Sequence, residues 1–215
     1  MSVSAYTAEY TGAIVPFAPI HPEDDWLHPT EPGAPFTRVE TYLLGFNIPE
    51  HAINCNIYLL WHPVFGCMSG HIFVTHGEVT YRHQLQAPYF NDHEYLPAAA
   101  GPSRFRLQLG SCTAEITVVE PLRQLDIRFT DADRDFRLDL VSEAALPPVG
   151  RPGGHHFTQL MRNRGTLRLA GETFAIDGYY MRDRSWGYQR PEGAEAAPPY
   201  RWITGWNDQG DGMVI

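Results

Sequence analysis

The sequence predicts an all-β fold in which antiparallel strands form a closed or nearly closed barrel. Apolar and polar residues alternate with the period of a half-buried strand in about eight to ten short stretches. The links between these stretches are short and turn-like, which pairs successive strands antiparallel. No long stretch has the periodicity of an amphipathic helix. Because a closed barrel leaves no exposed sheet edge, we rank it above the two-sheet β-sandwich that the same alternation permits.

The barrel is expected to occupy residues 37–215, after an irregular arm over residues 1–36. The arm contains six prolines and little periodicity, which is typical of a segment that lies against a barrel or covers one of its ends. A last strand at the end of the chain either closes the barrel or is cut short. The expected strands cover residues 38–46, 54–62, 70–76, 78–85, 104–109, 116–118, 125–129, 136–140, 167–169 and 174–176.

The segment from residue 154 to residue 187 carries most of the candidate chemistry. Two alternating stretches flank a turn at residues 170–172 and predict a β-hairpin. Asp177 and Gly178 interrupt the alternation, which predicts a bulge or a bend. Beyond them the chain groups ionisable and aromatic side chains: Tyr179, Tyr180, Arg182, Asp183, Arg184, Ser185 and Trp186.

Arg182, Asp183 and Arg184 need an explanation, because ionised groups are costly to bury unless they are paired. The functional interpretation places Asp183 at the mouth or floor of a pocket, with its protonation set by burial and by the two guanidinium groups. In the structural interpretation, an Arg-Asp-Arg network ties a strand end to a loop. The residue types alone leave both interpretations open.

His155 or His156 is the candidate partner of Asp183 in an acid/base pair, because histidine titrates near neutral pH. The alternative is that one imidazole points outward and the other is hydrogen-bonded inside. No metal site is expected, since His155 and His156, like His71 and His76, would face opposite sides of a strand.

Large aromatic side chains suit either a core or the wall of an apolar ligand cavity. A barrel of this strand number has an interior that just holds one small ligand, so the same rings would serve both purposes. The candidate ligand-binding residues are Trp186, Tyr179, Phe157, Trp61 and Tyr58.

Composition excludes several classes of function. The net charge of -9 gives no basic field for phosphates, so no nucleic-acid partner is expected. All 16 basic residues are arginines, which excludes chemistry through a lysine amine. Ser185 lies in no nucleophile motif and Cys112 has no evident base, so covalent acyl chemistry is not expected. With neither an export signal nor a membrane span in the sequence, we expect a cytoplasmic protein.

Residues 155–157, residues 165–167 and above all the run from residue 177 to residue 187, with its Asp-Arg-Ser-Trp-Gly motif, resemble a known family. They are similar to lipocalin-like proteins of the carotenoid hydratase (hydroxyneurosporene synthase) superfamily, and the resemblance extends from about His21 onward. It implies a tandem of two lipocalin-like (calycin-type) barrels with an apolar pocket, of which this chain would be the first. It also implies terpenoid or polyketide substrates and no redox cofactor.

By this resemblance, Asp183 would protonate an alkene beside His155 or His156, Tyr180 and Trp186. The expected function is a cofactor-independent enzyme that acts by proton transfer on a hydrophobic terpenoid-, steroid- or polyketide-like molecule, as a hydratase or dehydratase, isomerase or cyclase. Tyr180 would donate a hydrogen bond, Trp186 would stabilise developing positive charge, and the two flanking arginines would tune or orient the carboxylate.

The alternative is a non-catalytic lipocalin-like carrier that binds an apolar small molecule. A third hypothesis is an assembly module whose barrel is filled by its own side chains. A cavity reached by Asp183 would favour the enzyme. The expected partners are an apolar ligand or substrate and, in the assembly, a second copy of the chain or the missing second barrel.

Overall fold

The computed structural model describes residues 17–81, 84–95, 103–189, 204–207, 209 and 212–214. In this part of the chain the strands are accompanied by two 3-10 helices and by no α-helix. The elements are η1 Pro22–Asp25, β1 Arg38–Ile48, η2 Pro49–His51, β2 Ile53–His62, β3 Cys67–His76, β4 Gln86–Tyr95, β5 Arg104–Leu109, β6 Cys112–Glu120, β7 Gln124–Asp131, β8 Phe136–Ala144, β9 Val149–Gly150, β10 His156–Leu169, β11 Glu172–Gln189, β12 Thr204–Trp206 and β13 Gly212–Val214.

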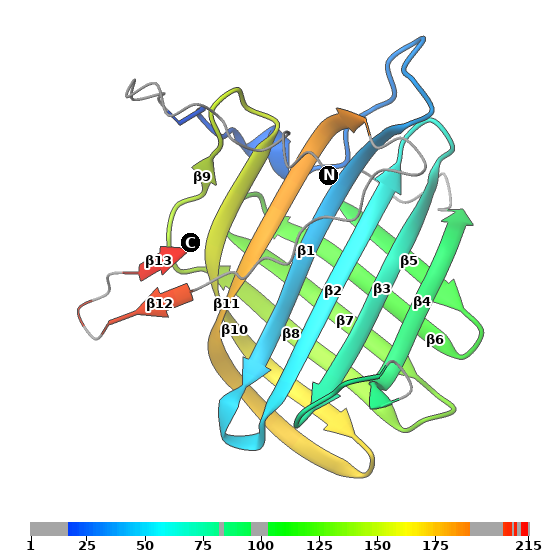
Figure 1. Cartoon of the computed structure of the whole chain (residues 1–215), viewed down its shortest axis with the longest axis vertical. Coiled ribbons are helices and arrows are strands. Elements are labelled where there is room, and N and C mark those ends of the chain that lie inside the picture. The colour runs from blue at the N-terminus through cyan, green and yellow to red at the C-terminus, as the bar shows by residue number, and fades with distance from the viewer. Residues whose placement is uncertain are drawn as a thin grey trace, which may run out of the picture.

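The main sheet has the strand order β4-β3-β2-β1-β11-β10-β8-β7-β6-β5, and its neighbours pair antiparallel. The sheet curls so that β11 and β1 to β4 face β10 and β8 to β5 (Figure 1). At the seam between its two edges, the backbone N–H of Gln108 in β5 donates to the Glu94 carboxylate in β4. The predicted all-β antiparallel barrel is therefore confirmed, and it is nearly closed.

The core lies inside the barrel, where alternate side chains of each strand meet. In β7 and β8 the buried positions recur at every second residue, as the alternation in the sequence predicts. Phe129 and Phe136 pack edge to face with ring centroids 5.1 Å apart. Cys55 lies in this core as a free thiol, and burial raises its pKa.

One predicted strand is wrong. Residues 78–85 were expected to pair, but the described residues of this segment form no strand, and β4 begins at Gln86. The side-chain oxygen of Gln84 accepts hydrogen bonds from the backbone N–H groups of Thr80 and Tyr81, at 2.9 and 2.8 Å. These bonds hold the backbone of Thr80 and Tyr81 close to the Gln84 side chain, outside any strand. Pro88 is accommodated within β4 because β4 is an edge strand.

The predicted hairpin is β10 and β11, whose register runs without a shift from His156 and Ser185 to Leu169 and Glu172. The bulge suggested for Asp177 and Gly178 is therefore wrong. The hairpin bends instead, as β11 curves around the lower end of the barrel in Figure 1. Near its tip β10 pairs with β8, while the far end of β11 pairs with β1, so the hairpin joins the two layers.

The described part of the arm, from Phe17 onward, reaches the upper end of the barrel, with η1 between the two layers (Figure 1). Trp26 and Leu27 pack against the core. The hydroxyl of Thr30 donates to the carbonyl of Pro63 at 2.6 Å, which ties the arm to the turn between β2 and β3. This end is called the mouth of the barrel.

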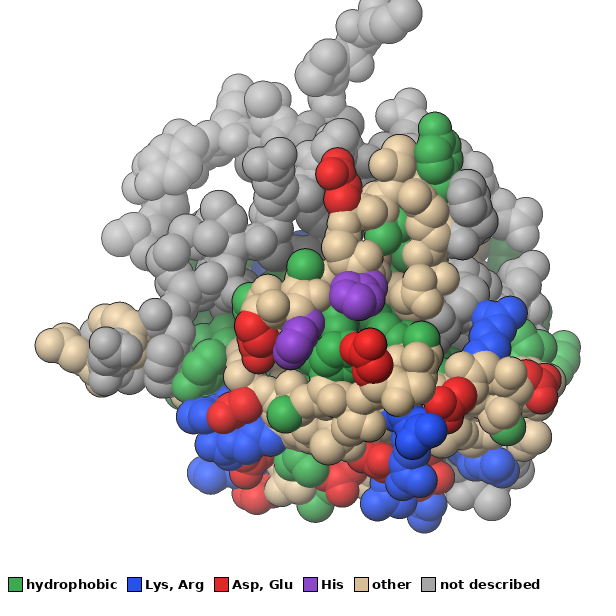
Figure 2. Space-filling model, turned by 90° about the horizontal axis from the view of Figure 1, so that it is seen from below, with side chains coloured by type: hydrophobic (Ala, Val, Ile, Leu, Met, Phe, Trp, Pro, Cys, Tyr) green, Lys and Arg blue, Asp and Glu red, His purple; other side chains and the backbone are tan. Residues whose placement is uncertain are grey.

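The outer face of β7, β8, β10 and β11 is covered with paired charges. Seen from below, acidic and basic side chains are mixed along one edge of the molecule (Figure 2). Such exposed pairs each contribute less than about 1 kcal/mol, so this wall is a solvated surface. None of the described helices has the length and apolar character needed to cross a bilayer. The exposed pairs on these strands include Arg128–Asp139, Arg137–Asp139, Arg162–Asp177, Arg164–Glu143, Arg164–Asp177 and Arg168–Asp135.

Candidate functional site

Residues 181–186 of β11 are all buried, although neighbours in a strand face opposite sides of the sheet. Ile176, earlier in the strand, belongs to the core inside the barrel. Alternation from Ile176 directs Arg182 and Arg184 inward and Asp183 outward. The polar run is thus divided between two sites on the two faces of one wall.

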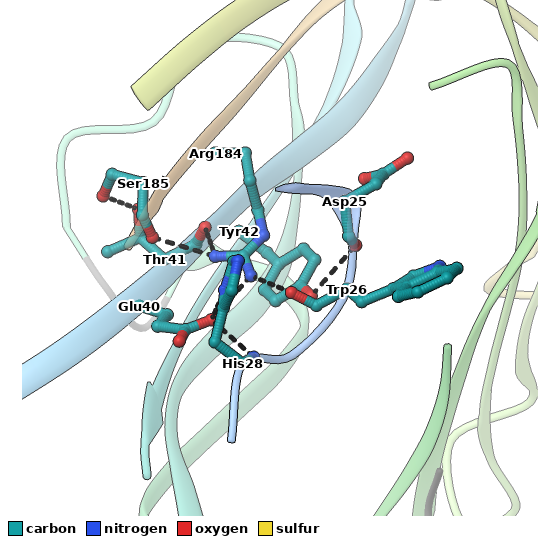
Figure 3. Close-up of polar contacts among 8 residues, drawn as sticks. All are labelled: Asp25, Trp26, His28, Glu40, Thr41, Tyr42, Arg184 and Ser185. Atoms are coloured by element: carbon teal, nitrogen blue, oxygen red, sulfur yellow. Dashed lines mark hydrogen bonds and ion pairs between the residues drawn. The ribbon is translucent and has the colours of Figure 1, made fainter. Parts of the chain in front are cut away.

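Arg184 lies at the centre of the inner site (Figure 3). Its guanidinium donates to the carboxylate of Glu40 and to the backbone carbonyl of Trp26, each at 2.6 Å. It also donates to the carbonyl of Ser185 at 2.8 Å and lies 4.1 Å from the ring centroid of Tyr42. Because the arm and two strands share this cation, Arg184 fastens the arm to the barrel.

Glu40 is fully buried beneath the arm. Burial alone would raise its pKa, but a hydrogen bond with His28, at 3.1 Å, and the charge of Arg184 together hold the pKa of Glu40 below its ordinary value. The His28 ring stacks on Trp186 with centroids 5.4 Å apart. The arm therefore contributes both an electrostatic partner and packing area to this site.

Stability should depend on pH through Glu40. Its folded pKa is lower than the value near 4.5 of an unfolded chain, so its contribution is complete above that pH and is lost as the pH falls through the folded pKa. The free energy of unfolding of the native chain should therefore exceed that of Glu40→Gln at pH 7, and the difference should narrow below about pH 4.5. Urea unfolding of both proteins between pH 7 and pH 3 measures this difference. A constant difference would contradict the assignment.

A second buried ion pair lies deeper on the same face. The guanidinium of Arg182 is 2.9 Å from the Asp25 carboxylate, and its Nε donates to the amide oxygen of Gln159 at 3.0 Å. The amide nitrogen of Gln159 donates to the carbonyls of Leu122 and Leu146, at 2.9 Å each. These contacts connect β11 with the arm, the β6–β7 turn and the loop after β8.

A cavity of about 580 Å³, here called the mouth cavity, opens between these same three segments. Its apolar lining consists of proline, leucine and alanine side chains, including those of Pro22, Leu122 and Leu146. Its three charged residues have partners of opposite charge, since Arg123 pairs with Glu120 and the Glu143 carboxylate pairs with a β10 arginine. The polar lining residues are Glu120, Arg123, Gln124, Glu143 and Gln159.

The outer polar patch consists of Thr41, His156, Asp183 and Ser185, all buried. The Nε2 of His156 lies 3.0 Å from the Oδ2 of Asp183, but the contact does not have hydrogen-bond geometry. Ser185 is paired with His156 across the strands, and its Oγ lies 2.6 Å from the Oγ1 of Thr41. A proton can pass between the His156 imidazole and the Asp183 carboxylate only after the two groups turn into hydrogen-bond alignment. Neither His156 nor Asp183 lines the mouth cavity.

The structure brings together some of the other predicted site residues at the mouth, where Phe157 and Trp186 are buried and His155 is exposed. The Phe157 and Trp186 rings are 6.2 Å apart, and the His155 ring is 5.9 Å from that of Trp186. Trp61 packs against the core. His155, Phe157, Trp186 and Trp61 are all absent from the lining of the mouth cavity. These side chains therefore pack near the arm and do not form the cavity wall.

The three predicted tyrosines lie elsewhere. The Tyr180 hydroxyl hydrogen-bonds with Asn56, and Tyr179 lies beneath the Arg162 guanidinium, which is 5.6 Å from its ring centroid. Tyr58 packs against an imidazole of β3. These contacts do not involve the His156–Asp183 pair, so the predicted hydrogen bond from Tyr180 to the acid/base group has no counterpart among them.

The predicted tuning of Asp183 by Arg182 and Arg184 has no support among the described ion pairs, because strand alternation turns both arginines to the opposite face, where they pair with Asp25 and Glu40. Sequence reasoning missed both acidic partners. A signal for Glu40 was present: it shares its parity in β1 with the apolar side chains of the core, and a carboxylate on that face needs a cation. No comparable periodic signal marks an acid in the irregular arm.

A family model described as "Domain of unknown function (DUF7064)" matches residues 21–215. The chain belongs to this family. No curated protein and no solved structure matches the chain. The matched region of the DUF7064 domain begins at His21, so it includes η1 and every segment that lines the mouth cavity. Asp25 and Trp26, the arm residues that contact Arg182 and Arg184, are thus part of the family domain.

Proposed function

We propose that this DUF7064 protein binds an apolar small molecule in the mouth cavity. The supporting observation is the cavity itself, whose volume of about 580 Å³ lies within the range of about 300–1,000 Å³ typical of small-molecule sites. Its lining combines proline, leucine and alanine side chains with a few polar groups, as such sites require. The polar groups would orient the ligand, and the apolar walls would provide most of the binding free energy.

Filling the cavity tests this proposal. Ala145 lines it, so Ala145→Trp should exclude the ligand, whereas Thr173→Trp, at an exposed position near the hairpin tip, should not. Native mass spectrometry should find a lipophilic molecule with the unmodified chain and with Thr173→Trp, and none with Ala145→Trp. Retention of the same molecule by Ala145→Trp would overturn the proposed site.

A second candidate function is the proton-transfer enzyme suggested by the resemblance, and the buried His156–Asp183 pair favours it. Asp183 would act as the acid or base and His156 would relay the proton, on a terpenoid-, steroid- or polyketide-like molecule. The substrate would then bind at the outer polar patch, not in the mouth cavity. We rank this candidate second because the described cavity at the mouth is not lined by Asp183.

Deuterium incorporation distinguishes the two functions. The native chain is incubated in deuterated water with a panel of terpenoid alkenes and ketosteroids. If the chain is an enzyme, we expect it to incorporate deuterium into at least one of these compounds. Asp183→Asn should then slow labelling by about 100-fold or more, as expected for the loss of a general acid or base. The control Asp177→Asn removes an exposed carboxylate of the same strand. Unchanged labelling in a folded Asp183→Asn protein would exclude this mechanism.

A further inference from the structure

The mouth cavity is built from segments that are distant in the sequence. Pro22 belongs to η1, Leu122 to the β6–β7 turn and Leu146 to the loop after β8. Loops and turns of this kind are the most mobile parts of a barrel unless their backbone groups are tied down. The size of the cavity therefore depends on what holds the three segments together.

A single chain of buried and partly buried polar contacts joins all three segments. The Oδ2 of Asp25, at the end of η1, accepts from the backbone N–H of Leu122 at 2.6 Å and contacts Arg182 at 2.9 Å. Arg182 leads to Gln159, whose amide nitrogen reaches the carbonyls of both Leu122 and Leu146. Gln159 is 1% exposed and lines the cavity, and it contacts the turn and the loop directly and η1 through Arg182 and Asp25.

We infer that Gln159 is a positioning residue of the mouth cavity, and that through Asp25 and Arg182 it couples ligand binding to the docking of the arm. The inference rests on the proposed binding function. Leu122 has a positive φ of 61°, a conformation that a leucine rarely adopts without tertiary support, and Gln159 and Asp25 supply that support by bonding its carbonyl and its N–H.

Coupling between two sites is reciprocal. A ligand that contacts all three segments should stabilise the docked arm. A substitution that loosens these segments should weaken both the affinity for the ligand and the protection of the arm against protease. Asn163 provides a matched control, because it is another buried amide on the inner face of β10 and donates to the carbonyl of Gly45, outside the cavity lining.

The test compares Gln159→Leu and Gln159→Glu with Asn163→Leu. Gln159→Glu keeps an acceptor for Arg182 but cannot donate to the two wall carbonyls, so it carries the test if Gln159→Leu does not fold. The probe is the neutral fluorophore N-phenyl-1-naphthylamine, whose Kd is measured by fluorescence titration. Chymotrypsin cleavage of the arm, near Trp26 and Leu27, is followed with and without the probe.

We expect the Gln159 variants to bind the probe about tenfold more weakly than the native chain and to lose its protection of the arm, while Asn163→Leu retains both. Equal behaviour of the Gln159 and Asn163 variants would overturn the inference. If the native chain and Ala145→Trp bind the probe equally well, or if the native chain does not bind it, the proposed binding site fails instead. In that case, faster cleavage of the arm in the Gln159 variants than in the native chain would still support a positioning role for Gln159. Cleavage at the native rate would contradict that role.

Discussion

Replacement of Arg184 by methionine should lower the free energy of unfolding by about 3–5 kcal/mol, the cost of leaving a buried charge without its partner. Arg184 and Glu40 are 1% and 0% exposed, and their charged groups lie 2.6 Å apart. Without the guanidinium, Glu40 must either stay ionised in the core with only His28 beside it or take up a proton. The variant also loses the donor to the Trp26 carbonyl that holds the arm.

Urea unfolding at pH 7 measures this loss, and Arg164→Met is the matched control. Arg164 has its carboxylate partner Glu143 at 2.7 Å, but both side chains are about half exposed, so the change should cost less than about 1 kcal/mol. The double variant Glu40→Met, Arg184→Met should recover about 2 kcal/mol or more of the loss, because it leaves no unpaired charge. Equal effects of the two single arginine variants would show that Arg184 is not an electrostatic anchor.

The barrel could be predicted because its strands are half-buried, so that the alternation of residues reports directly on the fold. It is clearest in β7 and β8, where the predicted apolar positions are all buried and polar side chains are buried only toward the strand ends, at Asp131 and Ser142. The prediction failed at β4 for compositional reasons. Residues 78–85 contain valine, threonine and tyrosine, which are typical of strands, whereas β4 contains Pro88, Asn91 and Asp92, which are not.

The candidate site was predictable only in part, because its contacts join residues that are distant in the sequence. The run at residues 181–186 was recognised as unusual, but adjacent residues of a strand do not share a face, so Asp183 could not pair with the arginines beside it. The true partners of Arg182 and Arg184 lie 157 and 144 residues away, in the arm and in β1. Asp183 lies beside one of the two predicted histidines, His156, and the acid/base role of this pair stays a prediction.

The second large effect is expected for Asp25→Ala, which should destabilise the chain by about 3–5 kcal/mol by leaving Arg182 buried without its carboxylate. The same change removes the acceptor of the Leu122 N–H, so the β6–β7 turn loses one of its ties to the arm. The neighbouring residue offers a close control. Asp24 is only partly buried and accepts from the backbone N–H of His21 among its described contacts, so Asp24→Ala should cost about 1 kcal/mol or less.

Amide hydrogen exchange separates the global and the local parts of this effect. If Asp25 serves as the electrostatic link between η1 and the barrel, Asp25→Ala should increase exchange in η1 and at Leu122 more than in β7 and β8, since the latter report global opening. Asp24→Ala should change exchange only in η1. A uniform increase in all of these segments would mean that Asp25 supports the barrel as a whole, and no increase at Leu122 would contradict the link between the arm and the turn.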